Sequence, residues 1–248
     1  MNGLRHNRKF AFLVVVFVLT PSMRPATQQS SIDSDPTNKP LEAKVREFQL
    51  DNETILDGLW KLARSTVPFG FGFEKILKTK LADPELPDPK FSFRLEGKSI
   101  REILDALCQT DARYAWSVDT ARVNVYPLAV VVDPTHLLNR KLAKFRLSNA
   151  SDVQKGLFEI SRQLPPPFEQ LAVAQVGGGD PYPPEPWTVT LSNVTVRQVI
   201  NRLAAHGGPN GIWIFGGAKD FRAFGFFNTH PSPWLEKTVK PPPPGAQP

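Results

Sequence analysis

The sequence predicts an α/β protein of the two-layer α+β type, built from two duplicated βαβ-βαββ domains with small sheets packed on helices. Two observations predict this class. A short strand-and-helix motif recurs four times, with the first copy matching the third and the second matching the fourth. The composition, 41% apolar and 22% charged, is that of a globular protein, and 248 residues give room for two modest cores.

The motif is clearest at residues 91–107. Phe91, Phe93 and Leu95 alternate along a strand, and Ser99 with Glu102 has the spacing of a helix-capping box. Each copy carries Asn or Gly at the corner between strand and helix, where we expect a positive φ. The four corners are Asn52, Gly97, Asn149 and Asn193, and the capping residues that follow them are Thr54, Ser99, Ser151 and Thr195.

The first domain is predicted for residues 44–127. Ile55, Leu59 and Leu62 give its first helix one apolar face, and the Phe-Gly-Phe run that follows predicts a strand that another backbone can approach closely. Trp116 lies in the closing hairpin and is expected to anchor the core. In order, the elements are a strand at 45–50, a helix at 54–64, a strand at 69–73, a loop at 79–90, the motif at 91–107, and strands at 113–118 and 122–126.

The second domain is predicted for residues 144–227 and repeats this order, with Trp213 in the position of Trp116. A linker at 128–143 joins the two domains, and its apolar start at 128–132 could extend a strand. The elements are a strand at 144–147, a helix at 151–163, a strand at 168–176, a loop at 177–186, a strand at 187–191, a helix at 195–205, and strands at 211–215 and 221–227.

Both ends of the chain differ in composition from the domains. Basic residues followed by an apolar run of about ten make residues 1–22 resemble an export signal, too short for a membrane span. Residues 23–43 are polar and proline-containing and are expected to be a disordered linker. Residues 228–248 form a proline-rich tail. We therefore expect an exported, periplasmic or extracellular protein without a membrane span once the signal is removed.

The charge distribution argues against a nucleic-acid partner. The formal net charge is +6, but three of the cations, Arg5, Arg8 and Lys9, belong to the expected signal. Residues 44–127 contain thirteen basic and thirteen acidic residues, and residues 144–227 contain eight and six. A nucleic-acid binder carries a dense basic face, and neither domain has one.

Residue types that perform chemistry are few and scattered. Cys108 falls on the apolar stripe of its helix and is expected to be a small core residue rather than a nucleophile. The histidines show no metal-binding spacing, and no nucleophile motif or phosphate loop is present. We therefore predict no enzyme, no cofactor and no metal. The histidines are His6, His136, His206 and His230.

The four motif copies and the closing hairpins resemble the STN domain, the short N-terminal domain of secretins and of signal-transducing TonB-dependent receptors. Residues 48–126 resemble one copy and residues 145–227 another, which is about two thirds of the chain. The resemblance implies a periplasmic, non-catalytic α/β module that contacts other envelope proteins. The chain departs from the family in having two copies and no secretin ring or receptor barrel after them, so no particular partner follows.

The sequence thus predicts an exported adaptor or assembly module of the bacterial cell envelope that works by binding proteins. Two alternatives stay open: a module that binds a glycan or peptide in an aromatic-lined pocket, and an unrecognised enzyme with titratable groups converging in one cleft. The closing hairpins are expected to be open sheet edges that a partner strand can join. The predicted contact residues are Phe221, Phe224, Phe226, Tyr182 and Trp234.

Overall fold

A computed structural model of the chain describes residues 39–65, 69–84, 87–119, 122–165, 171–177, 186–206 and 211–228. The expected signal, most of the linker at 23–43, Tyr182, Trp234 and the proline-rich tail lie outside these residues. No helix in the described part of the chain is both long enough and apolar enough to cross a membrane.

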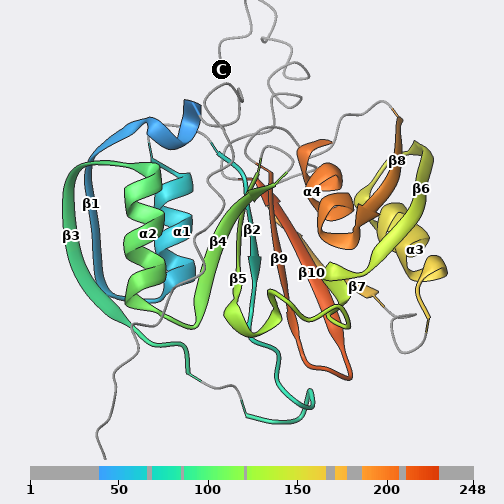
Figure 1. The fold of residues 1–248 in the computed structure, drawn as a ribbon, viewed down its shortest axis with the longest axis horizontal. Coiled ribbons are helices and arrows are strands. Elements are labelled where there is room, and N and C mark those ends of the chain that lie inside the picture. The colour runs from blue at the N-terminus through green and yellow to red at the C-terminus, as the bar shows by residue number, and fades with distance from the viewer. Residues whose placement is uncertain are drawn as a thin grey trace, which may run out of the picture. The chain divides into compact units, whose positions relative to one another are not determined.

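The elements of the first half follow the predicted order (Figure 1). A 3-10 helix comes first, inside the stretch expected to be disordered, and its Leu41 is buried in the core. The elements are η1 (Lys39–Glu42), β1 (Lys44–Glu53), α1 (Ile55–Ala63), β2 (Phe71–Glu74), β3 (Phe91–Ser99), α2 (Ile100–Thr110), β4 (Tyr114–Asp119) and β5 (Arg122–Pro127).

The second half repeats this order after two short 3-10 helices. One of these, η2 (Leu128–Val130), lies where the sequence allowed a strand extension, so that expectation is wrong. The mixed α/β class predicted from the sequence is confirmed. The remaining elements are η3 (Leu137–Asn139), β6 (Lys141–Ala150), α3 (Val153–Gln163), β7 (Leu171–Gly177), β8 (Trp187–Thr195), α4 (Val196–His206), β9 (Gly211–Gly217) and β10 (Arg222–Asn228).

The strands form one central sheet and two outer ribbons. In the central sheet the order is β4-β5-β2-β9-β10-β7, so three strands from each half are joined by the parallel pairing of β2 with β9. The antiparallel ribbons β1–β3 and β6–β8 have corresponding registers, with Phe48 opposite Leu95 in one and Phe145 opposite Leu191 in the other. The two predicted domains therefore share a sheet. Their origin by duplication stays a prediction.

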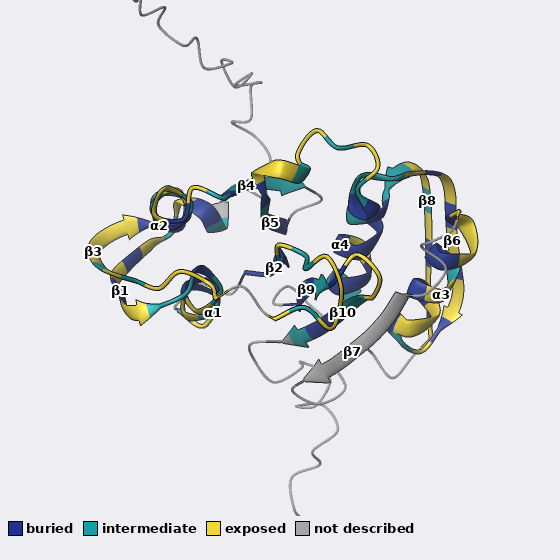
Figure 2. Cartoon of the chain, turned by 90° about the horizontal axis from the view of Figure 1, so that it is seen from below, coloured by how far each residue is buried: buried dark blue, intermediate teal, exposed yellow. Residues whose placement is uncertain are grey.

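The central sheet lies between two helix layers (Figure 2). Helices α1 and α2 cover one face and the β1–β3 ribbon covers them, with Leu59, Ile103 and Phe73 in this core. Helices α3 and α4 cover the other face beneath the β6–β8 ribbon, with Val199 and Phe224 in the second core. Each half thus has its own apolar core on its own face of the shared sheet.

The corner and capping predictions can be compared directly with the structure. The predicted positive φ is confirmed at all four corners, which lie between 53° and 62°. Capping boxes form at Thr54, Ser99 and Thr195. At the third helix the prediction is wrong: Asp152, not Ser151, caps α3 by accepting from the Lys155 amide at 3.0 Å, because one extra residue lengthens this turn.

Candidate functional site: a basic cleft beside a buried polar cluster

A cleft of about 770 Å³ opens where three adjacent parallel strands end. Strands β5, β2 and β9 run in the same direction, and residues after each of them line the cleft, at the lower end of the sheet in Figure 1. The chain after β2 stays beside β9 because the Lys75 amide donates to Phe215 O at 2.8 Å and the Lys219 amide to Lys78 O at 3.0 Å. The carboxyl ends of parallel strands are a common place for ligands.

The wall of the cleft is largely apolar and partly open to solvent. Leu128 is 51% exposed and Ile76 is 39% exposed, which is unusual for large apolar side chains on either side of one concave surface. The described residues that line it include no Phe, Tyr or Trp, so this part of the cleft does not match the aromatic-lined pocket considered from the sequence. The apolar lining consists of Ile76, Leu77, Pro127, Leu128, Ala129, Val130 and Leu137.

Basic side chains outnumber acidic ones in this lining. Asp133 is the single carboxylate among the described lining residues, and hydrogen bonds from Thr135 hold its pKa below the usual range. Arg113 is paired with Asp111 at 2.7 Å. The ammonium groups of Lys75 and Lys219 form no ion pair with any described residue, so their charges face the cleft uncompensated. The four cations are Lys75, Arg113, Lys219 and Arg222.

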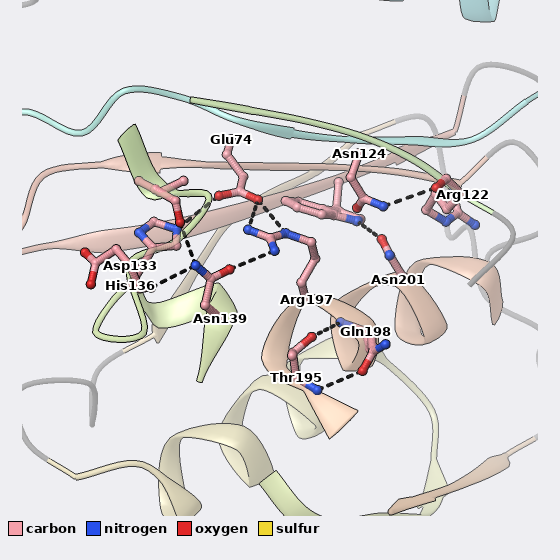
Figure 3. Close-up of polar contacts among 12 residues, drawn as sticks. Glu74, Arg122, Asn124, Asp133, His136, Asn139, Thr195, Arg197, Gln198 and Asn201 are labelled. Atoms are coloured by element: carbon pink, nitrogen blue, oxygen red, sulfur yellow. Dashed lines mark hydrogen bonds and ion pairs between the residues drawn. The ribbon is translucent and has the colours of Figure 1, made fainter. Parts of the chain in front are cut away.

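Behind the cleft, a buried carboxylate ties three parts of the chain together (Figure 3). Glu74, at the end of β2, is only 1% exposed. Its Oε1 accepts from Arg197 Nε of α4 at 2.7 Å, and its Oε2 lies 3.0 Å from Nε2 of His136, which lines the cleft. Arg197 Nη1 also donates to Asn139 Oδ1 at 2.8 Å. The site wall is therefore fixed by groups from both halves and from the segment between them.

Asn139 continues the cluster into the wall of the cleft. Its Nδ2 donates to the backbone oxygens of Val130 and Asp133, at 2.6 and 2.8 Å, which folds the segment after β5 into its compact shape. Arg197 stacks over the Tyr126 ring at 5.1 Å. These contacts make the cleft pre-organised, because its lining segment is held by side chains that do not themselves line it.

The buried cluster can orient the His136 imidazole, and among the described residues no free nucleophile lies beside it. A carboxylate that contacts one ring nitrogen of a histidine fixes the ring orientation, as in many acid–base sites. The Thr135 hydroxyl, the nearby candidate nucleophile, donates instead to Asp133 at 2.6 Å. Among the described residues, no group of three or more His, Cys, Asp or Glu side chains is arranged to hold a metal ion.

The predicted contact residues are not brought together at this site. Phe224 and Phe226 are buried in the second core, 0% and 1% exposed, and β10 is paired on both sides, by β9 and by β7. The prediction that this strand is an open edge is therefore wrong for the second hairpin. Phe221 is 42% exposed in the β9–β10 turn, and Tyr182 and Trp234 lie outside the described residues.

The first hairpin does reach a sheet edge, because β4 is the outermost strand of the central sheet. Cys108 was expected inside the core; it is partly buried and packs against the first core, and burial raises the pKa of its thiol to about 12. The sequence reading missed Glu74, Arg197 and His136. One signal was available: Glu74 follows the buried Phe-Gly-Phe strand directly, where a charged side chain needs a partner.

In comparisons with known proteins, no family model, no curated protein and no solved structure matches this chain. The structure itself defines a mixed α/β protein with a shared central sheet, and the resemblance to STN domains stands on the sequence pattern.

Proposed function

We propose that this chain is an exported, non-catalytic binding module of the bacterial envelope, and that the cleft holds an acidic segment of another protein. The observation that carries the proposal is the pairing of an exposed apolar wall with uncompensated cations at one end of the sheet. An apolar wall binds a buried side chain by the hydrophobic effect, and the cations attract neighbouring carboxylates and select against basic partners.

The rigidity of the site supports binding rather than chemistry. Glu74, Arg197 and Asn139 hold the lining segment in place, so little conformational entropy is lost when a ligand enters. His136 Nε2 is already engaged by Glu74, and the Thr135 hydroxyl by Asp133. The geometry therefore favours capture of a partner over an enzymatic reaction.

A displayed library of random peptides tests this proposal with the full chain as target. We expect enrichment of peptides in which Asp or Glu flanks an apolar residue. Reversing two charges, Lys75→Glu with Lys219→Glu, should weaken binding of the selected peptides at least about tenfold, since two attractive pairs become repulsive. The matched control is Lys141→Glu with Lys144→Glu, two exposed lysines of β6 that lie outside the cleft and change the net charge equally.

Two results would overturn the proposal. One is selection of peptides without acidic residues, or binding that the cleft variant and the control variant weaken alike. The other is binding of anionic phospholipid vesicles, measured by co-sedimentation and lost only in the cleft variant, while no peptide is enriched. The second result would assign the cleft to a lipid surface instead of a protein.

The proposed export needs a test of its own, because it rests on the expected signal at residues 1–22 and not on the cleft. Val15→Asp with Val16→Asp interrupts the apolar run, and each charge costs about 2.5–3.5 kcal/mol at the centre of a membrane-inserted segment. We expect the variant to accumulate in the cytoplasm, as followed by fractionation. Exchanging the same two valines for leucine should leave export unchanged, and unchanged fractionation of the aspartate variant would remove the envelope from the proposal.

A further inference from the structure

The two halves meet at a junction, the parallel pairing of β2 with β9. Each outer edge of the central sheet carries a strand equivalent to one of these two. In chain order and pairing, β9 corresponds to β4, β10 to β5, and β7 to β2. The strand order is β4-β5-β2 in the first half and β9-β10-β7 in the second. At the junction β2 of the first half therefore pairs with β9, the counterpart of β4 in the second half. Within the described chain, the outer sides of β4 and β7 pair with no strand.

Trp116 of β4 and Trp213 of β9 occupy corresponding positions, and only β9 has β2 beside it. Trp213 of β9 donates to Asn201 of α4 at 2.7 Å, and Trp116 of β4 donates to Asp105 of α2 at 2.8 Å, which are corresponding contacts. Trp213 is fully buried, with β2 beside it, whereas Trp116 remains half-buried with no strand on its outer side. Strand β4 therefore lacks the cover that its counterpart has.

The helices carry a second, independent sign. Gly58 lies against Leu107 and Gly156 lies against Leu203, which aligns α1 with α3 and places Trp60 in correspondence with Phe158. Trp60 crosses the junction: its ring contacts Phe227 of β10 edge to face, with centroids 5.5 Å apart. Phe158 is 66% exposed and makes no ring contact with a described residue. Phe158 therefore has the position of Trp60 but lacks the aromatic partner that Trp60 has in Phe227.

We propose that a second copy of this chain fills these positions, with β4 of one copy adding in parallel to β7 of the next, head to tail. Phe158 then packs against Tyr126 of the copy that supplies β4, because Tyr126 occupies in β5 the place that Phe227 has in β10. Inside one copy Phe73 of β2 lies opposite Ile214 of β9. The corresponding positions between copies are Val176 of β7 and Ser117 of β4. Within its described residues each copy leaves the same two edges unpaired, so the contact is heterologous and extends into a ring or a filament.

The outer contact differs from the internal one at one position. The Trp213 ring lies over Gly72, and a Cβ there would overlap it. Gln175 stands in the place of Gly72, so the added strand cannot approach the Trp116 ring as closely as β2 approaches the Trp213 ring. We therefore expect an association weaker than the internal junction and dependent on protein concentration. The inference is separate from the cleft, since neither Phe158 nor Ser117 is among the residues that line it.

Cysteine crosslinking of the full chain tests the register. In Ser117→Cys with Val176→Cys, mild oxidation should give a ladder of disulfide-linked multimers on a non-reducing gel, because the two positions lie on opposite edges of one copy and face each other between copies. Each single variant should give dimers at most. The mismatched control, Ser117→Cys with Lys141→Cys, should give no ladder, because Lys141 lies on the β6–β8 ribbon.

Sedimentation equilibrium tests the aromatic contact without disulfides. We expect Phe158→Asp to raise the apparent dissociation constant at least about tenfold, and Phe158→Trp, which copies Trp60, to lower it or leave it unchanged. Both substitutions are at an exposed site, and an unchanged circular dichroism spectrum confirms folding. A monomer at all soluble concentrations, a closed symmetric dimer, or equal crosslinking of matched and mismatched pairs would each overturn the proposal.

Discussion

At the residue scale, Glu74 is the most deeply buried charged side chain of the described residues, and Arg197 and His136 both contact it. Taking a carboxylate out of water costs several kcal/mol unless it is paired and hydrogen-bonded. Arg197 supplies a salt bridge at 2.6 Å and His136 a second contact at 3.0 Å. The cluster therefore stabilises one arrangement of the two halves, and removing one partner exposes the full cost of burial.

We predict that Arg197→Met lowers the free energy of unfolding by about 3–5 kcal/mol, the usual effect of breaking a buried ion pair. Urea unfolding followed by tryptophan fluorescence measures it. Arg162→Met is the matched control, because Arg162 is exposed and its ion pair with Glu159 is long, at 3.6 Å. This substitution should lower the free energy of unfolding by less than about 1 kcal/mol. Equal effects of the two substitutions would show that Glu74 finds another partner or water.

Cys108 offers a test of burial by chemistry. Its thiol pKa is raised to about 12, because burial disfavours the thiolate and Asp105 and Asp111 lie nearby. The thiolate is the form that reacts with iodoacetamide. We predict that alkylation at pH 8 is about a hundredfold or more slower in the folded protein than in urea, where the pKa returns to about 8.5. Comparable rates in both states would place the thiol at the surface.

At the scale of elements, the third helix separates the predicted cap from the observed one. Asp152→Ala should cost about 1 kcal/mol of stability, because the Lys155 amide loses its acceptor. Ser151→Ala removes only a contact with Asp152 and should be nearly neutral. Thermal unfolding of the two variants decides between the caps. A larger loss for Ser151→Ala would restore the cap predicted from the sequence.

The sequence predicted the elements well because their signals are local. A corner Asn or Gly, a capping residue and an apolar stripe all lie within one motif, and the positive φ at Asn149 follows from its neighbours alone. The cap at Asp152 was missed because Ser151 and Asp152 are both good capping residues, and the extra residue in this turn decides between them.

The site was largely beyond prediction because its residues meet only through the shared sheet. Glu74, His136 and Arg197 are far apart in the chain, and the parallel pairing of β2 with β9 brings them together. Nothing in the β2 motif specifies β9 as its neighbour. The same pairing explains why Phe224 and Phe226 were expected at an edge: β7 covers β10, and a strand that returns from earlier in the chain leaves no local sign.

At the scale of the molecule, the shared sheet predicts a single unfolding transition. Ile212 of β9 belongs to the core of the first half, and Trp60 of α1 packs on Phe227 of β10. We therefore expect urea transitions followed by far-UV circular dichroism and by fluorescence to coincide, and a chain ending at residue 140 to fail to fold. Two separated transitions, or a folded fragment, would mean that the halves are independent domains.

The β2–β9 pairing also sets when the protein can fold. Strand β2 (Phe71–Glu74) and its neighbour β9 (Gly211–Gly217) lie far apart in the sequence. Contacts between residues so distant in sequence slow folding, because a long loop must close before they form. The central sheet therefore cannot be completed before β9 has been synthesised. Under the proposed export of this chain through a membrane in the unfolded state, the dependence on β9 would keep the earlier segments competent for transport, and the sheet would close only on the far side.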